Sequence, residues 1–136
     1  MSALFPARQT WQPTESATPA SRHIHGSVSK TLAGFFGELQ TTWPAVAEAC
    51  HILPAHLGPE LLRWLSTSRW RTLGMEKAAP RLRELMLKYA DRPMDLADAS
   101  MVWAAEQTGL RQILTTDRTD FTIYRTKTGQ RLEILP

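Results

Sequence analysis

Hydrophobic side chains recur at helical spacing along the middle of the chain. Apolar residues three or four positions apart share one face of a helix, so this spacing predicts amphipathic helices that pack against a core. Four such helices are predicted, over residues 27–38, 44–54, 59–66 and 76–89. Pro44 suits the first turn of the second helix. Trp64, Trp70 and Leu73 are expected to pack in the core rather than to stack on bases.

The last third of the chain alternates between helical and strand patterns. Four elements are predicted in order: a helix over residues 95–108, a short buried strand over 112–116, a helical turn over 119–121 and a final strand over 131–135. Gly109 is placed to end the helix. This order is typical of a parallel α/β sheet, in which sites gather at the carboxyl ends of the strands. Asp117 lies at such an end.

The first 26 residues differ from the rest of the chain. They are rich in Ser, Thr, Pro and Ala and show neither helical nor strand periodicity. We therefore expect an irregular or disordered leader over residues 1–26 that contains no strand. A chain of 136 residues is long enough for one domain with a real core and too short for two, so residues 27–136 are expected to form that domain.

Composition narrows the class of protein. The hydrophobic fraction is 43%, and no apolar run approaches the roughly 18 residues of a membrane span, so we expect a soluble protein. The single cysteine, Cys50, cannot form an internal disulfide. That fits a reducing compartment, and we expect a cytoplasmic protein.

The net charge of +3 is unevenly placed. Between residues 60 and 92 the basic side chains outnumber the acidic ones; they are Arg63, Arg69, Arg71, Lys77, Arg81, Arg83, Lys88 and Arg92. Such a segment is either a solvated helix face or a surface that binds a polyanion. Charge alone does not decide between the two.

Acidic residues gather around the predicted helix and strand of the last third. Asp95 and Asp98 lie three positions apart and share a helix face, and Asp117 follows the buried strand. Clustered carboxylates repel one another unless a cation neutralises them, and hard oxygen ligands suit Mg²⁺ or Mn²⁺. The alternative is structural, because Asp95 can cap the helix and Asp120 the short turn.

Three segments together resemble a known family. Residues 89–100 read YADRPMDLADAS, residues 113–121 read ILTTDRTDF, and residues 39–50 read LQTTWPAVAEAC. In this order and spacing they resemble PIN-domain proteins, in particular the toxin ribonucleases of VapBC-type toxin–antitoxin pairs. The resemblance covers roughly residues 27–136. It implies a three-layer α/β/α sandwich with a short parallel sheet.

The resemblance also implies a reaction and the residues that carry it. Glu48, Asp98 and Asp117 would be the catalytic carboxylates and, with Asp95, the ligands of Mg²⁺ or Mn²⁺. Thr116 and Asp120 would support the site. Members of the family hydrolyse RNA phosphodiesters with metal-activated water. The implied partners are an RNA substrate, a cognate antitoxin and a second copy of the chain, and Arg81, Arg83 and Lys88 are candidates for RNA contacts.

The chain departs from the family at its beginning. The family opens with a strand that ends in an aspartate ligand, whereas no aspartate precedes Asp91 here. We therefore expect that strand to be absent or replaced. A domain that binds RNA or an antitoxin without cleaving is the alternative function. A phosphoacceptor receiver domain is a third candidate function. It is disfavoured because no lysine follows a buried strand.

Overall fold

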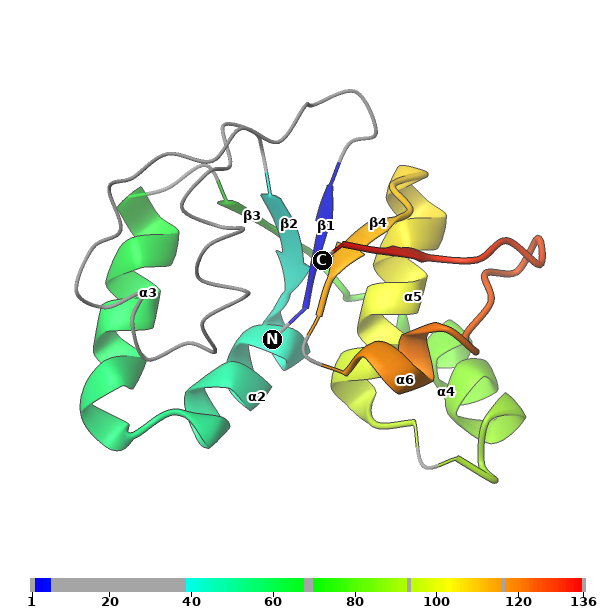
Figure 1. The fold of residues 1–136 in the computed structure, drawn as a ribbon, viewed down its shortest axis with the longest axis horizontal. Helices are drawn as coiled ribbons and strands as arrows, with labels where there is room; N and C mark the ends of the chain where they lie inside the picture. The colour runs from blue at the N-terminus through cyan, green and yellow to red at the C-terminus, as the bar shows by residue number, and fades with distance from the viewer. Residues whose placement is uncertain (1, 6–38, 68–69, 93, 116, 136) are drawn as a thin grey trace.

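The computed structural model describes residues 2–5, 39–67, 70–92, 94–115 and 117–135. The predicted helix over residues 27–38 lies outside these ranges, as does most of the leader. The described residues form a mixed α/β fold, which confirms the predicted fold class. In Figure 1 the sheet runs through the middle, with α3 to its left and α4 and α5 to its right. No helix among the described residues is long and apolar enough to cross a membrane.

The sheet has five strands in the order β3-β2-β1-β4-β5. Their bounds are Ala3–Phe5 for β1, Leu39–Thr42 for β2, Trp70–Leu73 for β3, Gln112–Leu114 for β4 and Glu133–Ile134 for β5. The outer pairs, β2 with β3 and β4 with β5, are parallel, and for β4 and β5 this confirms the prediction. The central strand β1 is antiparallel to both of its neighbours.

The expectation that residues 1–26 contain no strand is wrong at β1. Leu4 pairs with Gln40 of β2 on one side and with Ile113 of β4 on the other. A run of three residues is too short to show an alternating pattern, and its pairing on both edges comes from distant parts of the chain. The first strand of the family is therefore replaced here rather than absent. The replacement, β1, runs antiparallel to both of its neighbours.

The helices agree closely with the predicted ones. Their bounds are Trp43–Ile52 for α2, Ala55–Leu57 for the 3-10 helix η2, Gly58–Thr67 for α3, Ala79–Lys88 for α4, Leu96–Thr108 for α5 and Arg118–Phe121 for α6. Helix α4 begins three residues later than predicted, with Pro80 in its first turn. Proline fits there because its missing N–H would have no partner inside the helix.

Helix α5 is fixed at both ends by local chemistry. The Asp95 side chain caps it by accepting a hydrogen bond from the Asp98 N–H at 2.8 Å. Gly109 ends it with a φ of 72°, a left-handed conformation that favours glycine. Between these ends the helix is buried on most of its faces, from Ala97 to Ala105. Its first turn is thus held rigidly where the sheet ends.

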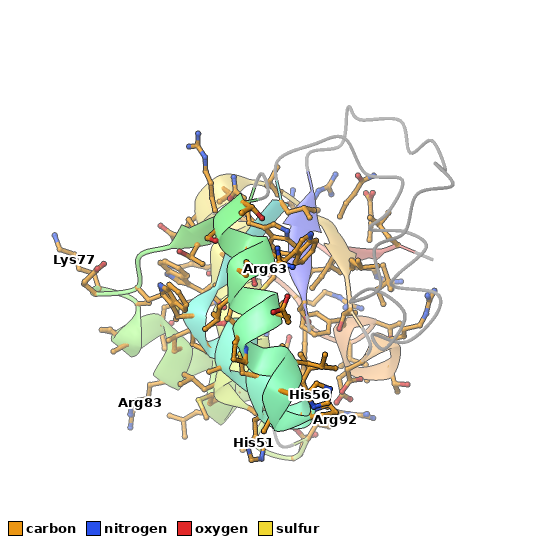
Figure 2. The ribbon with its side chains drawn as sticks, turned by 90° about the vertical axis from the view of Figure 1, so that its left-hand side faces the viewer. His51, His56, Arg63, Lys77, Arg83 and Arg92 are labelled. Atoms are coloured by element: carbon orange, nitrogen blue, oxygen red, sulfur yellow. The ribbon has the colours of Figure 1, made fainter. Side chains whose placement is uncertain are left out.

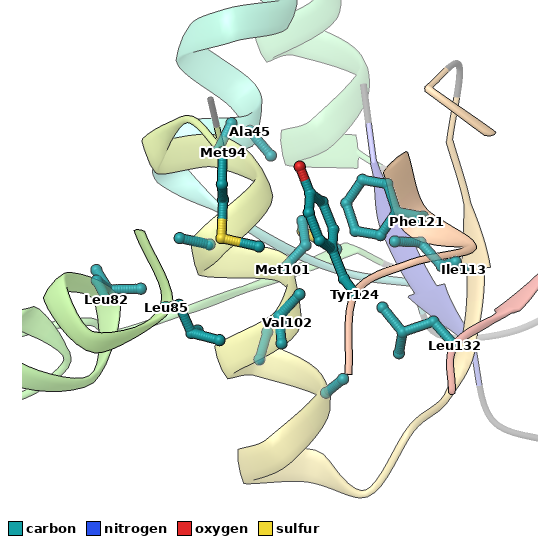
Figure 3. Close-up of a cluster of buried hydrophobic side chains, with 14 of the residues drawn as sticks. Ala45, Leu82, Leu85, Met94, Met101, Val102, Ile113, Phe121, Tyr124 and Leu132 are labelled. Atoms are coloured by element: carbon teal, nitrogen blue, oxygen red, sulfur yellow. The ribbon is translucent and has the colours of Figure 1, made fainter. Parts of the chain in front are cut away.

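The core lies between α5, α4 and the segment that follows β4 (Figure 3). Its largest fully buried side chains include Tyr124, Phe121, Leu85, Met101 and Ile113. Burying a side chain of this size stabilises the fold by roughly 1.5 to 3 kcal/mol. The Tyr124 ring packs edge-to-face against Tyr89 and Phe121, with centroids 5.0 and 5.3 Å away.

Strand β3 is an element that the sequence did not predict. Its first residue, Trp70, packs edge-to-face against Trp64 of α3, with ring centroids 5.0 Å apart. Both rings are half-buried and lie outside the main core cluster, whereas Leu73 packs against it, so the expected core packing is confirmed for Leu73. The strand forms because β2 offers a parallel partner, with Thr41 opposite Thr72.

Candidate metal centre

The predicted acids converge on one end of the sheet. Helix α2 begins directly after β2, α6 begins close behind β4, and the first turn of α5 lies at the same end (Figure 1). The carboxyl ends of β2 and β4 therefore bring Glu48, Asp98 and Asp117 into one region, as expected for an α/β sheet.

Three carboxylates form the centre of this region. One side-chain oxygen each from Asp98, Asp117 and Asp120 lies within 4.8 Å of the other two. Asp98 comes from α5, whereas the other two come from the start of α6. Asp117 also caps α6, since its side chain accepts a hydrogen bond from the Asp120 N–H at 3.2 Å. The suggestion that Asp120 caps this turn is wrong, because Asp120 is already inside the helix.

Glu48 and Asp95 lie at the margin of these three. Burial raises the pKa of Glu48, and the neighbouring charges of Asp95 and Asp117 raise it further. Asp95 is exposed and caps α5, which confirms the structural alternative considered for it. Capping leaves a second carboxylate oxygen available, so the two roles are compatible. Thr116 lies outside the described residues.

Asp98 is the acid whose charge the fold disfavours most. Burial raises its pKa from 3.8 to about 7, and the charge of Asp95 adds to the effect. The Tyr124 hydroxyl opposes it by donating a hydrogen bond to Asp98 Oδ2 at 3.1 Å. Burial also raises the pKa of the Tyr124 phenol, which therefore keeps its proton and remains a donor. No spacing in the sequence connects these two residues.

Buried hydroxyl groups underlie the acids. Thr115 Oγ1 accepts a hydrogen bond from the Asp117 N–H at 3.1 Å. Thr42 and Ser100 share a hydrogen bond between their side chains, and both are fully buried. Thr115 is thus a supporting hydroxyl among the described residues, and the supporting role predicted for Thr116 stays a prediction.

No ion pair among the described residues involves the three central acids. Arg118 of α6 donates a hydrogen bond to the Leu135 carbonyl oxygen at 3.2 Å, and Arg81 of α4 pairs with Glu106 and Glu84, at 2.7 and 2.9 Å. Carboxylates this close, without an ion-pair partner in the part of the chain that the structure describes, favour binding of a cation. The donors are all hard oxygens, which fit Mg²⁺ or Mn²⁺ and do not fit a soft metal.

The candidate RNA-binding residues differ in their surroundings. Arg81 is engaged by its two glutamates, and Lys88 Nζ lies 5.0 Å from the centre of the Tyr89 ring. Arg83 is exposed and projects outward in Figure 2, as do Lys77 and His51. Of the three candidates, Arg83 and Lys88 therefore keep a charge that no carboxylate among the described residues pairs with.

Comparison with known proteins finds a ribonuclease of similar sequence. The chain is 28% identical to Ribonuclease VapC26 of Mycobacterium tuberculosis (strain ATCC 25618 / H37Rv) over 126 residues, which cover 86% of this chain and 90% of that protein. The chain is similar to a VapC ribonuclease over most of its length. No family model matches it.

Proposed function

We propose that this chain is a divalent-metal-dependent endoribonuclease of the PIN/VapC toxin type. The observation that carries the proposal is the convergence of Asp98, Asp117 and Asp120 at the carboxyl end of the sheet, with oxygens within 4.8 Å of one another. The similarity to a VapC ribonuclease supports the same reaction class. The carboxylate cluster and the nuclease relative both support this conclusion.

The acids divide between holding the metal and supporting it. Glu48, Asp98 and Asp117 are the proposed catalytic ligands, Asp95 is a further ligand, and Asp120 supports the site together with Thr116. A bound Mg²⁺ or Mn²⁺ would lower the pKa of a water molecule and offset charge on the phosphoryl oxygens. Tyr124 keeps Asp98 oriented through its hydrogen bond.

The proposed partners follow from the reaction class and the relative. RNA is the substrate, and a cognate antitoxin masks the acids. A homodimer is the proposed assembly. Exposed Arg83 and Lys88 are proposed to contact the RNA backbone, because phosphate contacts need cations that are not already paired.

The test is cleavage of a structured RNA by the purified chain with Mg²⁺, with Mn²⁺ and with excess chelator. We expect cleavage only with metal, and a loss of about a hundredfold or more in Asp98→Asn and Asp117→Asn. Asp91→Asn is the matched control, since Asp91 is an exposed acid in the turn after α4. Cleavage that persists in the chelator, or in both site variants, contradicts the proposal.

One observation favours the alternative of a domain that binds RNA or an antitoxin without cleaving. Ser2, which directly precedes the central strand, lies at the end of the sheet where the acids lie, and neither Ser2 nor Ala3–Phe5 of the strand carries a carboxylate. This alternative predicts RNA binding that survives Asp98→Asn and no stabilisation of the protein by Mn²⁺. Thermal unfolding with and without Mn²⁺, paired with RNA titration, separates it from the nuclease.

A further inference from the structure

The direction of β1 gives its first residues an unusual place. Because β1 is antiparallel to both neighbours, its amino end lies where β2 and β4 reach their carboxyl ends. Ala3 pairs with Leu114, which brings Ser2 next to Thr115 just beyond the strand. Ser2 is only 6% exposed, so it is a buried polar residue at the edge of the acid cluster.

Ser2 is hydrogen-bonded on both sides. Its hydroxyl donates to Thr115 Oγ1 at 3.0 Å, and its carbonyl oxygen accepts from Thr41 Oγ1 at 3.0 Å. Thr115 Oγ1 in turn accepts from the Asp117 N–H at 3.1 Å. Two consecutive hydrogen bonds therefore connect β1 to the residue that carries one of the three central carboxylates.

The acid cluster is thus tied to the sheet at two points. The Thr42–Ser100 hydroxyl pair joins β2 to α5, the helix of Asp98. The Ser2–Thr115 pair joins β1 to the turn that carries Asp117, and Asp117 caps the helix of Asp120. The first pair fixes one half of the cluster and the second pair fixes the other.

We propose that Ser2 is a positioning residue of the metal centre. Through Thr115 it fixes Asp117 and, by way of the α6 cap, Asp120 at their distance from Asp98. The inference rests on the proposed function for its metal, but the link from Ser2 to Asp117 exists in the metal-free protein. It assigns a role in the site to the strand that the sequence pattern did not reveal.

The first test measures amide hydrogen exchange in the metal-free protein. In Ser2→Ala, exchange of the Asp117 amide should be about fivefold faster, the effect expected of one neutral hydrogen bond. Ser2→Thr keeps the hydroxyl and should restore the slow exchange. Thr126→Val is the matched control: it removes a buried hydroxyl that bonds Thr128 away from the acids, and it should leave the Asp117 amide unchanged.

The second test measures Mn²⁺ affinity by calorimetry. Ser2→Ala should bind Mn²⁺ about fivefold more weakly, while Ser2→Thr and Thr126→Val stay within about twofold of the original chain. If Ser2 acts through Thr115, the double variant Ser2→Ala/Thr115→Val should bind no more weakly than Thr115→Val alone.

The outcomes separate this inference from the proposed function. If Ser2→Ala leaves both the Asp117 exchange rate and the Mn²⁺ affinity unchanged, Ser2 is not a positioning residue, whether or not RNA is cleaved. An additive loss in the double variant also overturns it. If the original chain binds no Mn²⁺ but Ser2→Ala still speeds exchange at Asp117, the positioning role stands and the metal-dependent function fails.

Discussion

The carboxylate of Asp98 is subject to two opposing effects on its charge. It is partly buried beside other acids, which disfavours its charge, and it accepts a hydrogen bond from Tyr124, which favours it. Burial is the larger effect, so its pKa rises to about 7. Such a group is poised to exchange its proton for a metal ion near neutral pH.

The raised pKa of Asp98 predicts how stability changes with pH. Between about pH 4 and 7 the folded metal-free protein holds a proton that the unfolded chain has lost, so its free energy of unfolding falls as the pH rises. Asp98→Asn removes the charge and should stabilise the metal-free protein at pH 8 by about 1 to 2 kcal/mol, less than the shift alone implies because solvent reaches the carboxyl group. Urea unfolding should show a smaller gain at pH 5; an equal gain at both values contradicts the assignment.

The Tyr124 hydroxyl offers a second test on the same carboxylate. Tyr124→Phe keeps the packed ring and removes the donor, so the pKa of Asp98 should rise further and Mn²⁺ binding at pH 7 should weaken about fivefold. Tyr89→Phe is the control, because its hydroxyl accepts from the Arg125 N–H and does not contact Asp98. Calorimetry that finds equal Mn²⁺ affinities in the two variants would remove Tyr124 from the site.

The sequence predicts the acids of the site better than their supports. Asp98 and Asp117 follow from local signals, namely a helix start and a strand end. Tyr124 and Ser2 reach the site only through the fold, from 26 residues after Asp98 and from 113 residues before Thr115. A contact between distant residues leaves no spacing in a single sequence, so neither support was predictable.

At the scale of elements, the helices were predictable because each carries its own signals. Asp95 and Gly109 mark the two ends of α5, and Pro44 and Pro80 mark the starts of α2 and α4. Strands β1 and β3 carry no such signals, because short strands are stabilised mainly by their neighbours. The direction of β1 depends on the whole sheet and is even less accessible to a local pattern.

Two glycines give a matched test of one of these signals. Gly109 has a φ of 72°, whereas Gly58 at the start of α3 has a φ of −56°, and an added Cβ would meet nothing within 4 Å at either position. Gly109→Ala should therefore destabilise the protein by about 1 to 2 kcal/mol through backbone strain alone. Gly58→Ala should be neutral or stabilise by about 0.5 kcal/mol. Thermal unfolding that ranks the two variants the other way would refute the cap at Gly109.

At the scale of the molecule, exposed cations surround the sheet on helices and in turns. Figure 2 shows Arg63 on α3, Arg83 on α4, and Lys77 and Arg92 in turns. Arg81 belongs structurally to the core side of α4, since Glu106 pairs with it and also accepts from the Lys127 N–H at 2.6 Å. Reversing the charge of Arg81 would leave Glu106 without its ion-pair partner and destabilise the fold. A loss of RNA binding in that variant could then not be told from a loss of stability.

RNA binding along α4 is therefore better tested by reversing the charges of Arg83 and Lys88 together. If these side chains contact phosphates, the double variant to Glu should bind a single-stranded RNA more weakly, and the slope of log affinity against log salt should fall by about 1 to 1.5. The matched control reverses Lys127 and Arg131, one Lys and one Arg that are both exposed in the segment between α6 and β5. Both double variants change the net charge by the same amount. A purely long-range electrostatic effect would therefore lower the RNA affinity equally in both. Equal losses, or none, would mean that α4 is only a solvated face.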